Sequence, residues 1–181
     1  MRFQLNITLT EDDYLAFNIF SSFESSHGKK QFRKNQFKLA ATLVLIAVLG
    51  TLLPGRNVYS TTYAVSMGIF IPVYVFLCGI IIKRKAKTSI KQMKKRGKLP
   101  FEPVSRFEFY DDKLVEITPS TRTEQTYDVM ERICIVRNQY ILLYCSSVSA
   151  YILPIPQIEA QLNKDEFLSF LSQKCGTIEH Y

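Results

Sequence analysis

Two uncharged apolar stretches decide the fold: LAATLVLIAVLGTLLPG at residues 39–55 and YAVSMGIFIPVYVFLCGIII at residues 63–82. Only a short segment that contains Arg56 separates them. An apolar run of about 18 residues or more without charges is a candidate membrane-spanning helix. Two such runs in succession predict a transmembrane hairpin, with a first helix at 37–55, an external turn at 56–62 and a second helix at 63–82.

The two predicted spans differ in length. The 17 uncharged positions of the first run cover about 25 Å, slightly less than the roughly 30 Å of hydrocarbon in a bilayer. Lys38 and Arg56 flank this run, and their long side chains can reach the headgroups. The second run is long enough alone, and Pro72 in its middle predicts a kink. Ala64 and Gly68 form a small-residue pair that would allow a partner helix to approach closely.

The charges are distributed unevenly and predict the orientation. Residues 1–98 carry 16 basic and 4 acidic side chains, whereas residues 99–181 carry 7 basic and 12 acidic ones. Such asymmetry indicates a polyanionic partner for the first half. Lipid headgroups are the polyanion expected beside two spans, and nucleic acid is not expected. Five basic residues precede the first span, nine follow the second, and Arg56 alone lies between. The positive-inside rule therefore predicts a multi-pass protein of the cell membrane with both termini in the cytoplasm.

The segment before the first span, residues 1–36, is predicted to hold a cytoplasmic strand and an amphipathic helix. Apolar and polar residues alternate over residues 3–9, which is typical of a half-buried strand. Thr10 then caps a helix, because three acidic residues follow it in the first turn, where the helix dipole favours negative charge. Since this segment and the C-terminal region lie on the same side of the membrane, we expect them to pack together.

Residues 101–181 are predicted to form a small antiparallel β domain closed by a C-terminal helix. Short β-branched and aromatic runs alternate with turn signals, which is typical of consecutive hairpins. The last helix is expected to begin at the cap Asn163 and to end at Gly176. The predicted fold class is therefore a membrane protein of α+β type, with a transmembrane hairpin and a cytoplasmic β domain. Residues 83–100 are expected to form a polybasic linker between them.

These segments together resemble the YcxB-like family of small bacterial two-span membrane proteins. FQLNITLTEDDYLAFNIF at the start, the two-helix hairpin, and FEFYDDKLVEIT with YDVMERICIVRNQYILLYCSSVSAYILPIPQIEA in the tail carry the resemblance. The resemblance implies a C-terminal domain similar to bacterial pleckstrin-homology-like domains. It implies no activity.

The candidate site is the basic run after the second span, which contains no acidic residue. Its nine basic residues are predicted to contact anionic lipid headgroups: Lys83, Arg84, Lys85, Lys87, Lys91, Lys94, Lys95, Arg96 and Lys98. Each such residue contributes about 1 kcal/mol near an anionic leaflet. A simpler interpretation is that these charges only set the orientation, and both interpretations stay open.

Nothing in the sequence predicts an enzyme. His27 and His180 are isolated, the four cysteines lack metal-ligand spacing, and no hydrolase, nucleotide-binding or zinc-protease motif occurs. No catalytic residue, metal or cofactor is therefore predicted. The first functional hypothesis is a membrane-anchored interaction or regulatory module that binds lipid headgroups or a protein partner. The alternatives are an immunity or stress-protection protein and a subunit of an oligomeric transporter.

Overall fold

The computed structural model describes the whole chain except residues 52–59, 96–98, 100, 147–148 and 177. Two compact units make up the described residues. The β unit combines Met1–Asn18 with Met93–Tyr181, and the helical unit is Ile19–Gln92. The N-terminal strand thus belongs with the C-terminal region, and the division between the units falls after residue 18.

The first sheet of the β unit joins the N-terminal strand to three strands that follow the helical unit in the sequence. Its strands run in the antiparallel order β1-β2-β3-β4. They are β1 (Phe3–Thr8), β2 (Val104–Phe109), β3 (Lys113–Ile117) and β4 (Arg122–Thr126). In the register of β1 and β2, Phe3 lies opposite Phe109 and Thr8 opposite Val104. The predicted alternation holds, because Leu5 and Ile7 are buried.

The second sheet has the order β7-β6-β5-β8. Its strands are β5 (Arg132–Val136), β6 (Tyr140–Tyr144), β7 (Ala150–Pro154) and β8 (Ile178–His180). Arg137 and Asn138 both have a φ of 51° in the tight turn between β5 and β6, and asparagine is enriched in this conformation. The prediction of a purely antiparallel domain was wrong in one respect. Strand β8 was not predicted, and it runs parallel to β5.

Four short helical elements complete the β unit: α1 (Glu11–Ile19), η2 (Tyr127–Val129), α4 (Ile155–Glu159) and α5 (Lys164–Cys175). The predicted caps are confirmed. The Asn163 side chain accepts hydrogen bonds from the backbone N–H groups of Asp165 and Glu166, and Gly176 ends α5 with a φ of 80°. Thr10 Oγ1 accepts from the Asp13 N–H at 3.2 Å. In return, an Asp13 carboxylate oxygen accepts from the Thr10 N–H at 2.8 Å.

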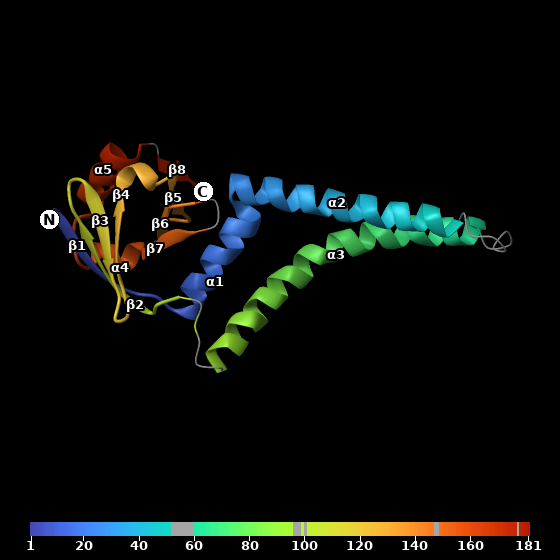
Figure 1. Ribbon diagram of the computed structural model, residues 1–181, viewed down its shortest axis with the longest axis horizontal. Coiled ribbons are helices and arrows are strands. Elements are labelled where there is room, and N and C mark those ends of the chain that lie inside the picture. Colours follow the sequence, from blue (N-terminus) through green and yellow to red (C-terminus); the bar gives the residue numbers. More distant parts are fainter. Residues whose placement is uncertain (52–59, 96–98, 100, 147–148, 177) are drawn as a thin grey trace. The chain divides into compact units, whose positions relative to one another are not determined.

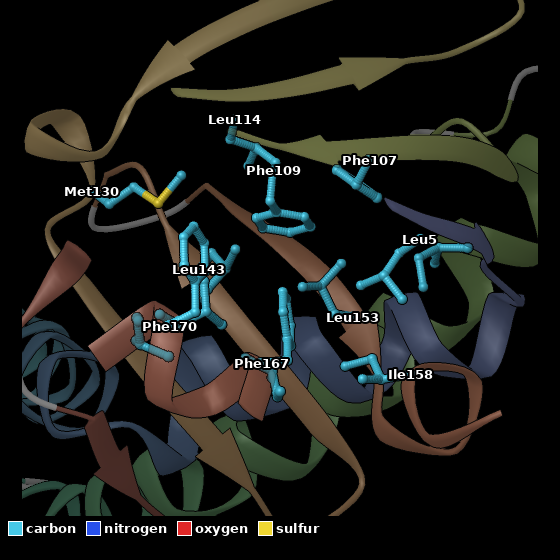
Figure 2. Close-up of a cluster of buried hydrophobic side chains, with 14 of the residues drawn as sticks. Leu5, Phe107, Phe109, Leu114, Met130, Leu143, Leu153, Ile158, Phe167 and Phe170 are labelled. Atoms are coloured by element: carbon cyan, nitrogen blue, oxygen red, sulfur yellow. The ribbon is translucent and has the colours of Figure 1, made fainter. Parts of the chain in front are cut away.

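The hydrophobic core lies between the two sheets, and Figure 1 shows α5 across one end of them. Figure 2 shows side chains from both sheets and from α5 pointing toward one another. The Phe109 and Phe167 rings meet edge to face with centroids 4.9 Å apart. Phe3 of β1 packs on Phe167 and Phe170, at 5.5 and 5.3 Å. The N-terminal strand therefore supplies part of the core, and a fragment that starts at residue 83 would lack it.

The helical unit contains the π-helical turn η1 (Phe20–Glu24) and the long helices α2 (Ser26–Thr51) and α3 (Ser60–Lys95). A sharp corner joins η1 to α2. Ser25 Oγ donates to the Ser21 carbonyl at 3.0 Å and accepts from the Gly28 N–H at 2.9 Å. A Cβ atom at Gly28 would lie 2.0 Å from the Ser21 carbonyl oxygen. The close approach of the two helical segments therefore requires glycine at this position.

One described helix is long and apolar enough to cross a membrane, over residues Val65–Ile82 of α3. Of this stretch, 6% is buried within the protein. The predicted first span, at 37–55, extends beyond the described residues, and its described part forms the end of α2. The described residues therefore contain a single candidate span, and the two-span hairpin stays a prediction. The Gln36 side-chain amide donates to the Val75 carbonyl at 3.2 Å, which fixes one point of contact between α2 and α3.

Candidate functional site: the basic end of helix α3

The predicted lipid-contact residues lie mainly on a helix and not on a linker. Helix α3 continues without a break from the apolar stretch to Lys95. Seven of the nine predicted residues are therefore helical, while Arg96 and Lys98 lie outside the described residues. The expected linker at 83–100 is corrected to this extent. The physical reason is that no glycine or proline occurs between Ile82 and Gly97 to end the helix.

Helical geometry collects most of these positions on one side of α3. At 3.6 residues per turn, six of them fall within an arc of about 120°. They are Lys83, Arg84, Lys87, Lys91, Lys94 and Lys95. Lys85 lies outside the arc. Arg84 and Lys85 are exposed to solvent. A linear run of charge in the sequence is thus a basic stripe on the helix, here called the α3 stripe and defined by those six residues.

The α3 stripe carries unbalanced charge. Lys83, Lys87, Lys91 and Lys95 follow one another at intervals of four residues, and no acidic residue lies between Ile82 and Glu102. Like charges at this spacing destabilise a helix by about 0.2–0.5 kcal/mol per pair. A polyanion beside the stripe would remove this repulsion. The arrangement is therefore suited to binding an anionic surface.

A second set of basic residues lies near the start of α2. Lys29, Lys30, Arg33, Lys34 and Lys38 are all exposed. The Gln36–Val75 hydrogen bond aligns residue 36 of α2 with residue 75 of α3, and so shows which part of α3 lies at the same height as each of these charges. Because antiparallel helices rise equally per residue, Lys38 is level with Val73 and Lys30 with Ile81. These charges are therefore level with the apolar stretch of α3 and not with the α3 stripe, although α2 and α3 diverge toward this end (Figure 1).

The structure also contains a cavity that the sequence did not indicate. It lies in the β unit, has a volume of about 430 Å³, and is lined by residues of α1, β2, β3, β7 and the segments next to them. Aromatic side chains and two carboxylates contribute to its wall: Tyr14, Phe17, Phe101, Phe107, Tyr151, Glu102 and Glu116. Residues so far apart in the sequence have no common spacing, so no motif could have revealed them.

Comparisons with protein-family models, with curated proteins and with solved structures found no match to this chain. The function is therefore inferred from the chain's own residues.

Proposed function

We propose that this is a membrane-anchored, non-enzymatic protein whose β unit serves as an interaction or regulatory module at the cytoplasmic face of the cell membrane. Two spans, at 37–55 and 63–82, form the anchor and leave both termini in the cytoplasm. Membership of the YcxB-like family and a pleckstrin-homology-like β unit are part of the proposal. The observation that carries it is the exposed apolar surface of Val65–Ile82, together with the exposed basic residues of α2.

The exposure of this stretch argues against a soluble core helix. Val65, Ile69 and Phe76 are 60%, 65% and 73% exposed. Apolar surface of this kind costs about 25 cal/mol per Å² in water. Helix α2 also presents exposed apolar residues, including Leu45 at 59% and Leu49 at 55%. An apolar medium around both helices removes this cost, and a bilayer supplies one.

The positions of the α2 charges along the hairpin indicate how much of it the hydrocarbon of the bilayer can cover. If the hydrocarbon covered all of Val65–Ile82, then Lys38, level with Val73, would lie near the bilayer centre, at a cost of about 2.5–3.5 kcal/mol. Lys34 and Arg33 would add to this cost. Leaving residues 77–82 outside forfeits only about 0.3–0.6 kcal/mol for each apolar residue. The proposed hydrocarbon edge therefore lies between the levels of Lys38 and Lys34, and the long Lys38 side chain reaches the headgroups from there.

At this depth, the basic residues of α2 and those of the α3 stripe differ in their distance from the lipid headgroups. Lys38, Lys34 and Arg33 lie at or near headgroup level, where attraction to anionic lipids is strongest, and Lys30 and Lys29 lie about 12–14 Å beyond Lys38. Lys83 is level with Gly28, ten residues or about 15 Å beyond Lys38. The far end of the α3 stripe lies further than one Debye length, about 8–10 Å, from the headgroups. Lys83, Arg84 and Lys87 therefore contribute less to lipid contact than the α2 charges, and Lys91, Lys94 and Lys95 contribute least.

The test uses the full chain in vesicles, because the β unit needs strand β1. Two variants with equal loss of charge are compared: Lys29, Lys30, Arg33 and Lys34 to Gln, and Lys87, Lys91, Lys94 and Lys95 to Gln. The enrichment of a spin-labelled anionic lipid around the protein is measured. We expect the first variant to lose more enrichment than the second.

Three results would contradict the proposal. A larger loss in the α3 variant would refute the proposed depth. Unchanged enrichment in both variants would refute the lipid contact. Recovery of the intact wild-type chain in the supernatant after an alkaline wash of membranes would refute the anchor itself.

A further inference from the structure

We propose that the cavity of the β unit binds an organic ammonium ion, held between aromatic side chains and the carboxylate of Glu116. This site is independent of the membrane anchor and of the basic residues, and it has the opposite charge preference. Its volume of about 430 Å³ is within the range of small-molecule sites.

The aromatic side chains of the cavity wall are the first of two features suited to an organic ammonium ion. Tyr14 of α1 stacks on Phe101, with ring centroids 4.8 Å apart. Phe107 of β2 meets Tyr151 of β7 edge to face at 5.4 Å. All four residues line the cavity. Aromatic faces attract alkylammonium cations, which are the type of ligand bound by aromatic cages.

The carboxylates of the cavity wall are the second feature suited to an organic ammonium ion. Glu116 of β3 lies partly buried in the cavity wall and accepts a hydrogen bond from Ser105 Oγ at 3.0 Å. Glu102 also lines the cavity. Among the described residues that line it there is no lysine, arginine or histidine. Burial raises the pKa of Glu116, and the negative charge of Glu102 raises it further. A bound cation would supply the positive charge that this carboxylate lacks.

The surroundings favour an organic cation over a metal ion. Metal ions such as Ca²⁺ require six to eight oxygen ligands in close geometry. The described residues contain no group of three or more side chains that could hold a metal ion. The cavity instead combines two carboxylates, hydroxyl groups and extensive aromatic surface. A weakly hydrated ammonium ion with an apolar body matches both the charge and the walls.

The test titrates the full chain, in a non-ionic detergent, with choline and with its neutral isostere 3,3-dimethylbutan-1-ol. Binding is followed by calorimetry and by NMR. We expect saturable choline binding and at least about tenfold weaker binding of the alcohol, because only choline carries the charge. Glu116→Gln should weaken choline binding by about tenfold or more. Glu131→Gln, an exposed carboxylate of the same unit outside the cavity, is the matched control and should leave binding unchanged.

Phe101→Leu tests the aromatic wall separately and should also weaken binding while leaving the thermal unfolding of the β unit close to wild type. Equal binding of choline and the alcohol, no saturable binding of choline, or unchanged binding in Glu116→Gln would overturn the proposal. Nanodiscs distinguish the source of the ammonium group. Weaker apparent binding of free choline in phosphatidylcholine discs than in phosphatidylglycerol discs assigns the site to a lipid headgroup, and equal binding assigns it to a free amine.

Discussion

The side-chain amide of Gln161 pairs with the backbone of Asn6 as a neighbouring strand would. Its Nε2 donates to the Asn6 carbonyl and its Oε1 accepts from the Asn6 N–H, both at 2.8 Å. Gln157 makes the same two bonds with Thr8, again at 2.8 Å. Two side chains four residues apart thus satisfy the outer edge of β1. An open strand edge is a site for pairing with another chain, so the part of this edge at Asn6 and Thr8 is closed to β-strand addition.

Replacing both glutamines should therefore destabilise the β unit and expose its edge. For Gln157→Ala with Gln161→Ala, we expect a loss of about 1–3 kcal/mol in the free energy of unfolding, since water partly replaces each hydrogen bond. Chemical denaturation of the full chain in detergent measures this loss. Gln173→Ala, on the exposed side of α5, is the control and should change stability by less than about 0.5 kcal/mol. Equal stability of both variants would show that the edge bonds contribute nothing.

Glu116 should make stability depend on pH. Burial raises the pKa of its carboxyl in the folded state, while the Ser105 hydrogen bond lowers it. The folded state therefore holds this proton more tightly than the unfolded state, and stability falls as pH rises from the ordinary carboxyl pKa of 4.5 through the folded pKa. Glu102, Tyr151 and Cys145 are the other titratable groups that interact with Glu116.

Two variants check this effect. Glu116→Gln should remove the pH-dependent loss, so that its stability relative to wild type is higher at neutral pH than below pH 4.5. Ser105→Ala should move the loss to higher pH, because it removes the hydrogen bond that favours the carboxylate. Denaturation at a series of pH values provides the measurement. A Glu116→Gln profile parallel to that of wild type would contradict the assignment.

Two glycines, one at the corner between η1 and α2 and one in α3, should respond differently to replacement by alanine. Gly28→Ala places a Cβ atom 2.0 Å from a backbone oxygen and should cost about 1–3 kcal/mol. At Gly68, no atom of the described residues lies within 4 Å of an added Cβ atom. Gly68→Ala should therefore be neutral or stabilising by up to about 1 kcal/mol, since alanine favours helix.

Thermal unfolding followed by far-UV circular dichroism compares the two glycine variants. A stable Gly28→Ala variant would mean that the corner relaxes freely. A destabilised Gly68→Ala variant would show that a partner helix packs against the predicted Ala64–Gly68 pair.

The cysteines of the β unit should react slowly with thiol reagents. Burial raises the pKa of Cys134 to about 12 and the pKa values of Cys145 and Cys175 to about 11. The thiolate is the reactive form, and it is scarce in the folded protein at neutral pH. Alkylation with iodoacetamide at pH 8, read by mass spectrometry, should therefore accelerate strongly on unfolding. Rapid alkylation of Cys134 in the folded chain would contradict its burial.

Local signals predicted much of this fold, and long-range contacts escaped prediction. The alternation of β1 and the caps at Asn163 and Gly176 depend on neighbouring residues, so they were predictable. The parallel pairing of β8 with β5, and the bonds of Gln157 and Gln161 to β1, join segments far apart in the chain. The β-branched and aromatic run at residues 126–136 does not form a single strand, because η2 turns Tyr127 into the core, where its hydroxyl donates to the Tyr110 carbonyl at 2.9 Å.

For the candidate sites too, local features were predictable from the sequence and long-range contacts were not. The basic residues after the second predicted span were evident from composition, but their helical continuation to Lys95 was not expected. The absence of any helix-breaking residue before Gly97 was the signal available for it. The cavity around Glu116 was not predictable, since folding alone brings α1, β2, β3 and β7 together around it.

The central proposal is that the chain crosses the bilayer twice and keeps both termini in the cytoplasm. Single cysteines introduced as His27→Cys, Thr61→Cys and Ser169→Cys test it with a membrane-impermeant maleimide, with the wild-type chain as the baseline. We predict that intact cells label only Thr61→Cys and that permeabilised cells label all three. Labelling of His27→Cys or Ser169→Cys in intact cells, or protection of Thr61→Cys there, would contradict the proposal.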